Sequence, residues 1–481
     1  MSRIKHLIIR NGNYCIRWAL TYMETFGFDD YLSPFTWRYA SPPMRSIFSE
    51  QHRRLTWRKV WAALAFAQFK AGIVSKPEWA DIEKHMPEVD IEKSLKIEKE
   101  IRHDLVAELR VFSQQCKIGG GKLHVGATSM DIEDNADVMH QKEAVRLLAK
   151  RVASVLSAME RLISKFQNVP CIAYTHLQAA EPTTLGYRFS VWGQDLLRDL
   201  ENLEWIDCEL YAKGLKGATG TAASYVSILG GNASKAEELE NNFLERLGLE
   251  AYDIATQTYS RKQDFELTSV LAGLAESLHK MALDIRLLQM QHEVTEPFLQ
   301  KQVGSSAMPF KRNPISCERI CSLARLVACA PAIAWENAAQ SGLERTLDDS
   351  ANRRVFLSQS FLALDEMLLL AYKVIDGLVI NEKVVKKNLQ THAPFALTEV
   401  LLMDLVKKGH SRQYAHEKLR DWSMEAWQEV LEGKENPLSK KVEKFDVTTH
   451  TGLAGIKAGK FAKKLKKKIA PYGETKKSST F

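Results

Sequence analysis

Five polar segments interrupt an otherwise helical pattern in this sequence, and the one at residues 304–314 has the composition best suited to chemistry. It supplies two hydroxyls, two cations and an amide from Ser305, Ser306, Lys311, Arg312 and Asn313. Glycine and proline bound the segment, and Pro314 is suited to the first turn of a following helix. Such a loop could bind an anion or move a proton. The alternative is an ordinary polar connection between helices.

Residues 126–135 form a second polar segment. Thr128 and Ser129 stand just before a long stretch of helical pattern, and acidic residues follow them. Hydroxyls in this place commonly cap a helix. A functional role is the alternative, because hydroxyls and free backbone N–H groups at a helix start can hold a carboxylate.

Histidines stand in two further segments. His176 lies in a polar stretch between two long helical patterns, and His103 stands between Arg102 and Asp104 in a charged helix. Histidine is the commonest general acid or base near neutral pH, so both are candidates for proton transfer. The alternatives are a structural role for His176 and an exposed helix face for residues 102–104.

The fifth segment, residues 345–354, is rich in arginine. Ser350 and Arg354 are four residues apart and share one helix face, while Arg345 lies just before that helix. Two arginines and a hydroxyl at one spot would suit a phosphate, because guanidinium groups offer planar pairs of donors. The alternative is a salt-bridged helix start that uses the neighbouring Asp348 and Asp349.

Long helices must position these segments. Gly and Pro are absent from residues 127–169, 274–296 and 343–376, and such runs favour long helices. Apolar residues between positions 138 and 166 repeat at spacings of three and four, a seam that packs on other helices. We therefore predict an all-α chain with an N-terminal helical domain at residues 1–128, a central bundle at 129–380 and a C-terminal helical domain at 381–481. Long apolar seams also predict subunit association.

Composition limits the class of protein. The 481 residues include 45% hydrophobic and 26% charged residues, which is typical of soluble globular chains. No charge-free stretch is long enough for a membrane span. The formal charge of +7 comes from basic ends at residues 1–23 and 454–481, so we expect a solvated tail, with polyanion binding as the alternative. Seven cysteines without zinc spacing fit a reducing compartment.

The order of the five segments resembles the fumarase/aspartase superfamily. Ser305-Ser306-x-Met308-Pro309-x-Lys311-x-Asn313-Pro314 matches its signature, and near-complete matches occur at Thr128-Ser129…Asp134-Asn135 and Thr175-His176-x-Gln178. Within the superfamily the chain is most similar to the animal-type adenylosuccinate lyases, over roughly residues 36–450. The most similar stretches are residues 38–42, 102–104, 257–262, 305–314 and 345–354. Residues 345–354 are interpreted as a phosphate site, which fumarases and argininosuccinate lyases would not need.

This resemblance implies a three-domain fold whose long helices form a homotetramer core of about 20 helices. Each active site would be shared by three subunits, which would explain why the segments lie far apart in sequence. The resemblance further implies nucleotide substrates, no metal, no organic cofactor, no membrane or nucleic-acid partner, and a cytoplasmic location.

The implied reaction is β-elimination of fumarate in purine nucleotide biosynthesis. Adenylosuccinate would give AMP, and succinylaminoimidazole carboxamide ribotide would give the carboxamide ribotide. A base must take a proton from the carbon beside a carboxylate, and an acid must protonate the leaving nitrogen. Cations and hydrogen-bond donors must hold the carbanion-like intermediate.

The matched motifs imply a role for each candidate residue. Ser305 is expected to be the base, on a mobile loop and activated by its surroundings, Lys311 among them; Ser306 is the alternative base. His176 is expected to be the general acid, and His103 to assist near the phosphate or to orient the acid. The succinyl carboxylates would be held by Thr128, Ser129, Gln257, Lys311 and Asn313. The other candidate substrate-binding residues are Arg38, Tyr39, Arg102, Asp104, Arg319, Arg345, Ser350 and Arg354.

Some features depart from the family pattern. Residues 1–35 extend beyond the resemblance, the Lys-rich end has no counterpart, and Ala222 stands where animal relatives are expected to have Gln. Three alternatives remain open: a sister enzyme such as an argininosuccinate lyase, a helical protein that kept the scaffold without catalysis, and a nucleic-acid-binding protein that uses the Lys-rich end. Intact Ser305, His176 and Lys311 argue against the second.

Overall fold

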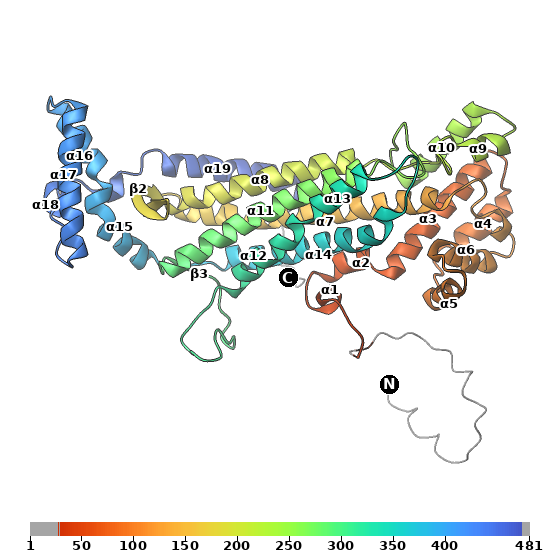
Figure 1. Cartoon of the computed structure of the whole chain (residues 1–481), viewed down its shortest axis with the longest axis horizontal. Coiled ribbons are helices and arrows are strands. Elements are labelled where there is room, and N and C mark those ends of the chain that lie inside the picture. Colours follow the sequence, from red (N-terminus) through yellow and green to blue (C-terminus); the bar gives the residue numbers. More distant parts are fainter. Residues whose placement is uncertain (1–26, 28, 474–481) are drawn as a thin grey trace, which may run out of the picture.

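The chain forms an elongated bundle of long helices with a smaller lobe at each end (Figure 1). This computed structural model describes residue 27 and residues 29–473. Most of the extension at residues 1–35, and residues 474–481 of the basic end, lie outside the described residues.

The bundle is built by α7 (Ser129–Phe166), α8 (Leu185–Glu209), α11 (Lys262–Met290), α12 (Ile315–Ala328), α13 (Ala330–Ala339) and α14 (Asp348–Asp376). With 38 residues, α7 is about 57 Å long at 1.5 Å per residue. The seam predicted between positions 138 and 166 lies in one continuous apolar core with residues of the other long helices. The prediction of an all-α fold with a long-helix bundle is confirmed.

One bundle helix is apolar enough to raise the question of a membrane. By length and composition α14 could cross one, and within the described residues it is alone in this. However, 61% of its most apolar window is buried inside the protein, as expected for the central helix of a bundle.

The N-terminal lobe joins two distant parts of the chain. It contains α1 (Pro34–Trp37), α2 (Pro42–Ile47), α3 (Glu50–Lys70), α4 (Lys76–His85), α5 (Ile91–Ile101) and α6 (Asp104–Gln115). From the middle of the chain, α9 (Ala223–Ile228) and α10 (Ala233–Leu247) pack beside α3 (Figure 1). Tyr225 and Phe243 share an apolar cluster with Trp57 and Trp61. The predicted boundary at residue 128 stays a prediction, because this lobe draws on residues beyond it.

The C-terminal lobe lies at the opposite end of the bundle. It contains α15 (Glu382–Ala396), α16 (Thr398–Lys407), α17 (Arg412–Leu431) and α18 (Leu438–Val442) (Figure 1). A two-stranded antiparallel hairpin, β1 (Pro170–Thr175) and β2 (Gln178–Thr184), packs on α15, and a short pair joins β3 (Val294–Thr295) to β4 (Val379–Ile380).

The Lys-rich end returns along the bundle as a helix. In α19 (Ala454–Ile469), the side chains of Ala454, Ala458, Ala462 and Leu465 are buried against α7 and α8, while most of the lysines face outward. Lys468 forms an ion pair of 2.7 Å with Glu204 of α8. The prediction of a solvated tail is therefore wrong for residues 454–469, since one face of this segment is apolar at helical spacing.

Candidate active site

A cavity of about 900 Å³ opens between the N-terminal lobe and the first turns of α7 and α14. Nine predicted site residues line it: Arg102, His103, Asp104, Thr128, Ser129, Gln257, Arg345, Ser350 and Arg354. They come from four segments that span about half of the sequence. The fold therefore brings together three of the five polar segments, residues 102–104, 126–135 and 345–354, and adds Gln257 from a fourth part of the chain.

The first turn of α7 forms one wall of this cavity. The buried Asp131 accepts a hydrogen bond of 3.0 Å from the Thr128 backbone N–H and closes the helix start. It also forms an ion pair of 2.6 Å with the buried Lys213. Because Asp131 is fixed in this way, the neighbouring Ser129 faces the cavity, where its Oγ lies 3.5 Å from the Nε2 of His103. The first turn of α7 is therefore capped, as one interpretation of the sequence predicts, and it also lines the cavity, as the other predicts.

The arginine-rich wall is paired with carboxylates. Arg354 forms an ion pair of 2.7 Å with Asp104, and Arg345 one of 2.7 Å with Asp349. Burial alone would raise the pKa of Asp104, but the guanidinium of Arg354 lowers it overall. The salt-bridged helix start weighed from the sequence is thus present at Arg345. Each guanidinium keeps further N–H groups that could meet an anion.

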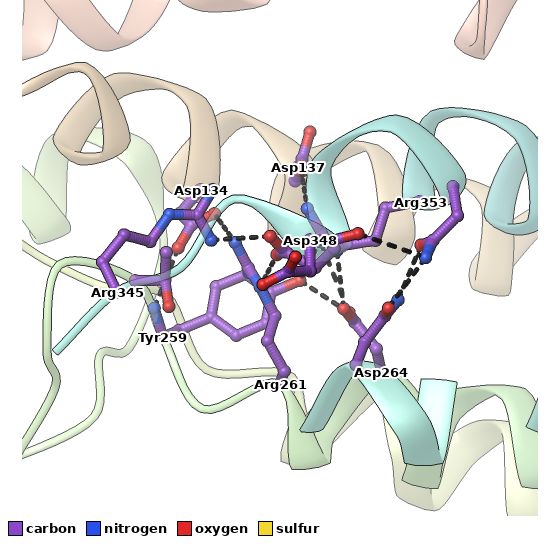
Figure 2. Close-up of polar contacts among 12 residues, drawn as sticks. Asp134, Asp137, Tyr259, Arg261, Asp264, Arg345, Asp348 and Arg353 are labelled. Carbon is purple, nitrogen blue, oxygen red and sulfur yellow. Dashed lines mark hydrogen bonds and ion pairs between the residues drawn. The ribbon is translucent and has the colours of Figure 1, made fainter. Parts of the chain in front are cut away.

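A buried polar network fixes this wall to the bundle (Figure 2). Arg353 of α14 forms ion pairs with Asp264 of α11 at 2.7 Å and with Asp137 of α7 at 3.1 Å. Tyr259 donates a hydrogen bond of 2.7 Å from its hydroxyl to Asp264, and that hydroxyl accepts one from Arg353. Arg261 links Asp134 of α7 to Asp349 of α14 at 3.0 and 2.6 Å. The network therefore locks three helices in register around the cavity.

Sequence reasoning missed several titratable groups that line the cavity, among them Arg353, Asp137 and Glu133. Glu133 has the most unusual surroundings of these three. It lies one helical turn beyond Ser129, so the two share a face of α7. Glu133 makes no hydrogen bond or ion pair with any residue that the structure describes. Burial raises its pKa to about 8, the carboxylates of Asp104 and Asp137 add to the shift, and Arg354 opposes it. The spacing of four from Ser129 was the signal that could have identified it.

The predicted catalytic loop lies away from this cavity, between β3 and α12. It extends from the side of the bundle (Figure 1). The Oγ of Ser305 accepts a hydrogen bond of 3.1 Å from the Met308 backbone N–H, and Asn313 donates one of 2.9 Å to the Gly304 carbonyl oxygen. The side chains of Ser306 and Lys311 are exposed. No described residue of the same chain stands beside Ser305 as a proton acceptor.

A third group of predicted residues lies near α2. The guanidinium of Arg319 stacks 5.5 Å from the ring centre of Tyr39 and lies 3.5 Å from the carboxylate of Glu366. The same carboxylate accepts a hydrogen bond of 3.0 Å from the Ala40 backbone N–H. Arg38 lies over the ring of Trp37 at 4.4 Å. None of these residues lines the cavity.

His176 also lies outside the cavity, at the tip of the β1–β2 hairpin. Its side chain is exposed. The hairpin is anchored where the Tyr174 hydroxyl donates a hydrogen bond of 3.2 Å to the carboxylate of Glu293, which also pairs with Arg188 at 3.3 Å. A single chain thus keeps its predicted acid, predicted base and nucleotide-binding residues at separate places. Their catalytic and binding roles stay predictions.

Comparison with known proteins gives the family. The sequence profile of the lyase family matches residues 36–328. Adenylosuccinate lyase of Saccharomyces cerevisiae is 39% identical over 87% of this chain and 88% of its own length. The enzymes of Schistosoma mansoni and Schizosaccharomyces pombe are 38% and 36% identical, over 86% and 94% of this chain and 88% and 97% of their own lengths.

Solved structures agree on the fold. Fumarate lyase from Mesorhizobium sp. BNC1 superposes with a TM-score of 0.77 over 90% of this chain and 99% of its own, at 24% identity. The 3-carboxy-cis,cis-muconate lactonizing enzyme from Pseudomonas putida gives 0.78 over the same shares, also at 24% identity. At this identity the likeness concerns the fold alone. By sequence, over most of its length, the chain belongs to the adenylosuccinate lyase family.

Proposed function

We propose that this protein eliminates fumarate from adenylosuccinate, giving AMP, and from succinylaminoimidazole carboxamide ribotide, giving the carboxamide ribotide. The observation that carries the proposal is the cavity in which hydroxyls at the start of α7 face the arginines of α14. Both substrates bear a phosphate and two carboxylates, and a site with several guanidinium and hydroxyl donors suits such anions. We further propose that the enzyme acts in the cytoplasm.

The chemistry follows from the residue types. Ser305 would take a proton from the carbon beside a succinyl carboxylate, and the electron pair would form the new double bond as the carbon–nitrogen bond breaks. His176 would donate a proton to the leaving nitrogen. Thr128, Ser129 and Gln257 would hold the carboxylates. Lys311 and Asn313, carried on the Ser305 loop, would stabilise negative charge on the intermediate.

These roles require more than one copy of the chain. Ser305, His176 and the cavity lie at separate places in one subunit, and exposed apolar side chains such as Val191, Trp335 and Val355 lie on the bundle helices. We therefore propose a homotetramer in which three subunits contribute to each site. Exposed apolar surface of this kind is typical of subunit interfaces.

A direct assay tests the function. Purified protein is mixed separately with adenylosuccinate, succinylaminoimidazole carboxamide ribotide and argininosuccinate, and fumarate release is measured for each. Turnover of the first two substrates supports the proposal. Turnover of argininosuccinate alone would show the sister activity, and no turnover of any of the three would favour a scaffold without catalysis.

A further inference from the structure

One side chain holds both ends of the Ser305 loop. Gln289 lies in the last turn of α11. Its Nε2 donates a hydrogen bond of 2.8 Å to the Arg312 carbonyl oxygen, and its Oε1 accepts one of 3.2 Å from the Glu296 backbone N–H. Glu296 stands where the loop leaves β3, and Arg312 stands shortly before α12 begins. A single amide therefore bridges the two ends of the loop.

The end of the loop that leads into α12 has a second attachment. The carboxylate of Glu296, which is 2% exposed, accepts hydrogen bonds of 3.0 and 3.1 Å from the Ser316 and Cys317 backbone N–H groups. Residue 314, at the start of α12, gives no side-chain cap of its own. Glu296 thus closes the first turn of α12, and Gln289 holds the backbone of Glu296. Together they form a fixed stem beneath the loop.

The loop narrows above this stem. Asn313 reaches across to the Gly304 carbonyl oxygen at 2.9 Å, and a Cβ on Gly304 would lie 2.2 Å from the Lys311 carbonyl oxygen. Above this neck, the described hydrogen bonds of residues 305–311 run within the segment, as from the Met308 backbone N–H to Ser305. Ser305 is therefore connected to the body of the protein through the neck and the stem.

On the basis of the proposed function, we propose that Gln289 is a positioning residue for the elimination, because its amide fastens both ends of the loop that presents Ser305. With both ends tied, the freely moving segment is short, and less conformational entropy is lost when the loop orders over substrate. With either end released, Ser305 would sample a larger volume. A displacement of about 1 Å at a reacting group can lower the rate on the order of a hundredfold.

Two substitutions separate the two bonds. Gln289→Leu removes both, and Gln289→Glu keeps the acceptor for Glu296 but loses the donor to Arg312. Both variants should lower kcat for adenylosuccinate by about tenfold to a hundredfold with little change in KM. Without substrate, both should also be cleaved faster by trypsin after Lys311 and Arg312. Gln291→Leu is the matched control, because its exposed side chain makes no hydrogen bond within the described residues.

The two readouts distinguish the possible failures. Wild-type kcat and wild-type trypsin cleavage in both Gln289 variants would overturn the inference. A lowered melting temperature with unchanged kcat and unchanged cleavage would show a structural role only, and would also overturn it. If wild-type protein turns over no adenylosuccinate, the proposed function fails, whereas the trypsin experiment still tests whether Gln289 holds the loop.

Discussion

Glu133 illustrates how burial can set the charge of a single residue inside a cavity. The carboxylates of Asp104, Asp134 and Asp137 raise the pKa of its carboxyl group further, and the guanidinium of Arg354 opposes them. With a pKa of about 8, it remains protonated at neutral pH, so it can donate a hydrogen bond to an anionic ligand. A charged carboxylate in the same place would repel a phosphate.

The pH dependence of stability tests this state. A raised folded-state pKa means that the folded protein keeps a proton that the unfolded chain has released. The free energy of unfolding should therefore fall as pH rises from about 4.5 to about 8 and then level off for this group. Glu133→Gln cannot titrate, so denaturant unfolding should show wild type losing stability relative to this variant between pH 5 and 8. Parallel curves would show that Glu133 is already ionised at pH 5.

At the scale of elements, the hairpin that carries His176 has an unusual turn. Thr175 pairs with Gln178, so the turn consists of His176 and Leu177, whose φ angles are +52° and +59°. Two-residue turns with both φ angles positive normally use Asn and Gly, because a Cβ is disfavoured in this conformation. Local strain of this kind often occurs at functional positions.

A substitution at Leu177 measures that strain. Leu177 is 74% exposed, so replacing it removes little buried surface from the subunit. Leu177→Gly and Leu177→Ala remove nearly the same side chain, but only Gly removes the Cβ. The Gly variant should be more stable than the Ala variant by roughly 1 kcal/mol. Denaturant unfolding of both at one protein concentration is the measurement, and equal stabilities would mean that the turn is unstrained.

The elements differ in how far the sequence predicts them. The length of α7 follows from the absence of Gly and Pro over residues 127–169. The sequence does not predict the β1–β2 hairpin, because its turn lacks the Asn-Gly pair that usually marks such turns. Helix α19 was predictable from Ala454, Ala458 and Ala462, which recur every four residues, but its lysines favoured the interpretation as a tail.

At the scale of the molecule, the sequence does not predict which charged residues form ion pairs across the fold. Arg353 was not a candidate, yet it joins Asp264 and Asp137, which are 89 and 216 residues away. Nothing in a local pattern selects these partners among 59 acidic residues. Motif order did identify nine of the residues that line the cavity, because each motif is short and local. It could not show that Ser305 and His176 stand outside the cavity of their own chain.

That separation leads to a prediction about the assembled protein. If each site takes Ser305 from one subunit and His176 from another, Ser305→Ala and His176→Ala proteins should each be inactive alone. When the two are unfolded together in equal amounts and refolded, random tetramers would contain sites with both wild-type residues. Half of the chains carry wild-type Ser305 and half carry wild-type His176, and the two residues of a site come from different subunits. About a quarter of the sites in a closed symmetric assembly should then contain both wild-type residues.

The fraction of recovered activity shows whether Ser305 and His176 of one site come from one chain or from two. A site formed within one chain would recover no activity, because every chain in the mixture lacks one of the two residues. Wild-type protein carried through the same unfolding and refolding sets the scale for complete recovery. Each variant refolded by itself sets the background. Sizing the mixture near four chain masses of 54.5 kDa checks that tetramers have formed. Recovery near a quarter would place the base and the acid of one site on different subunits.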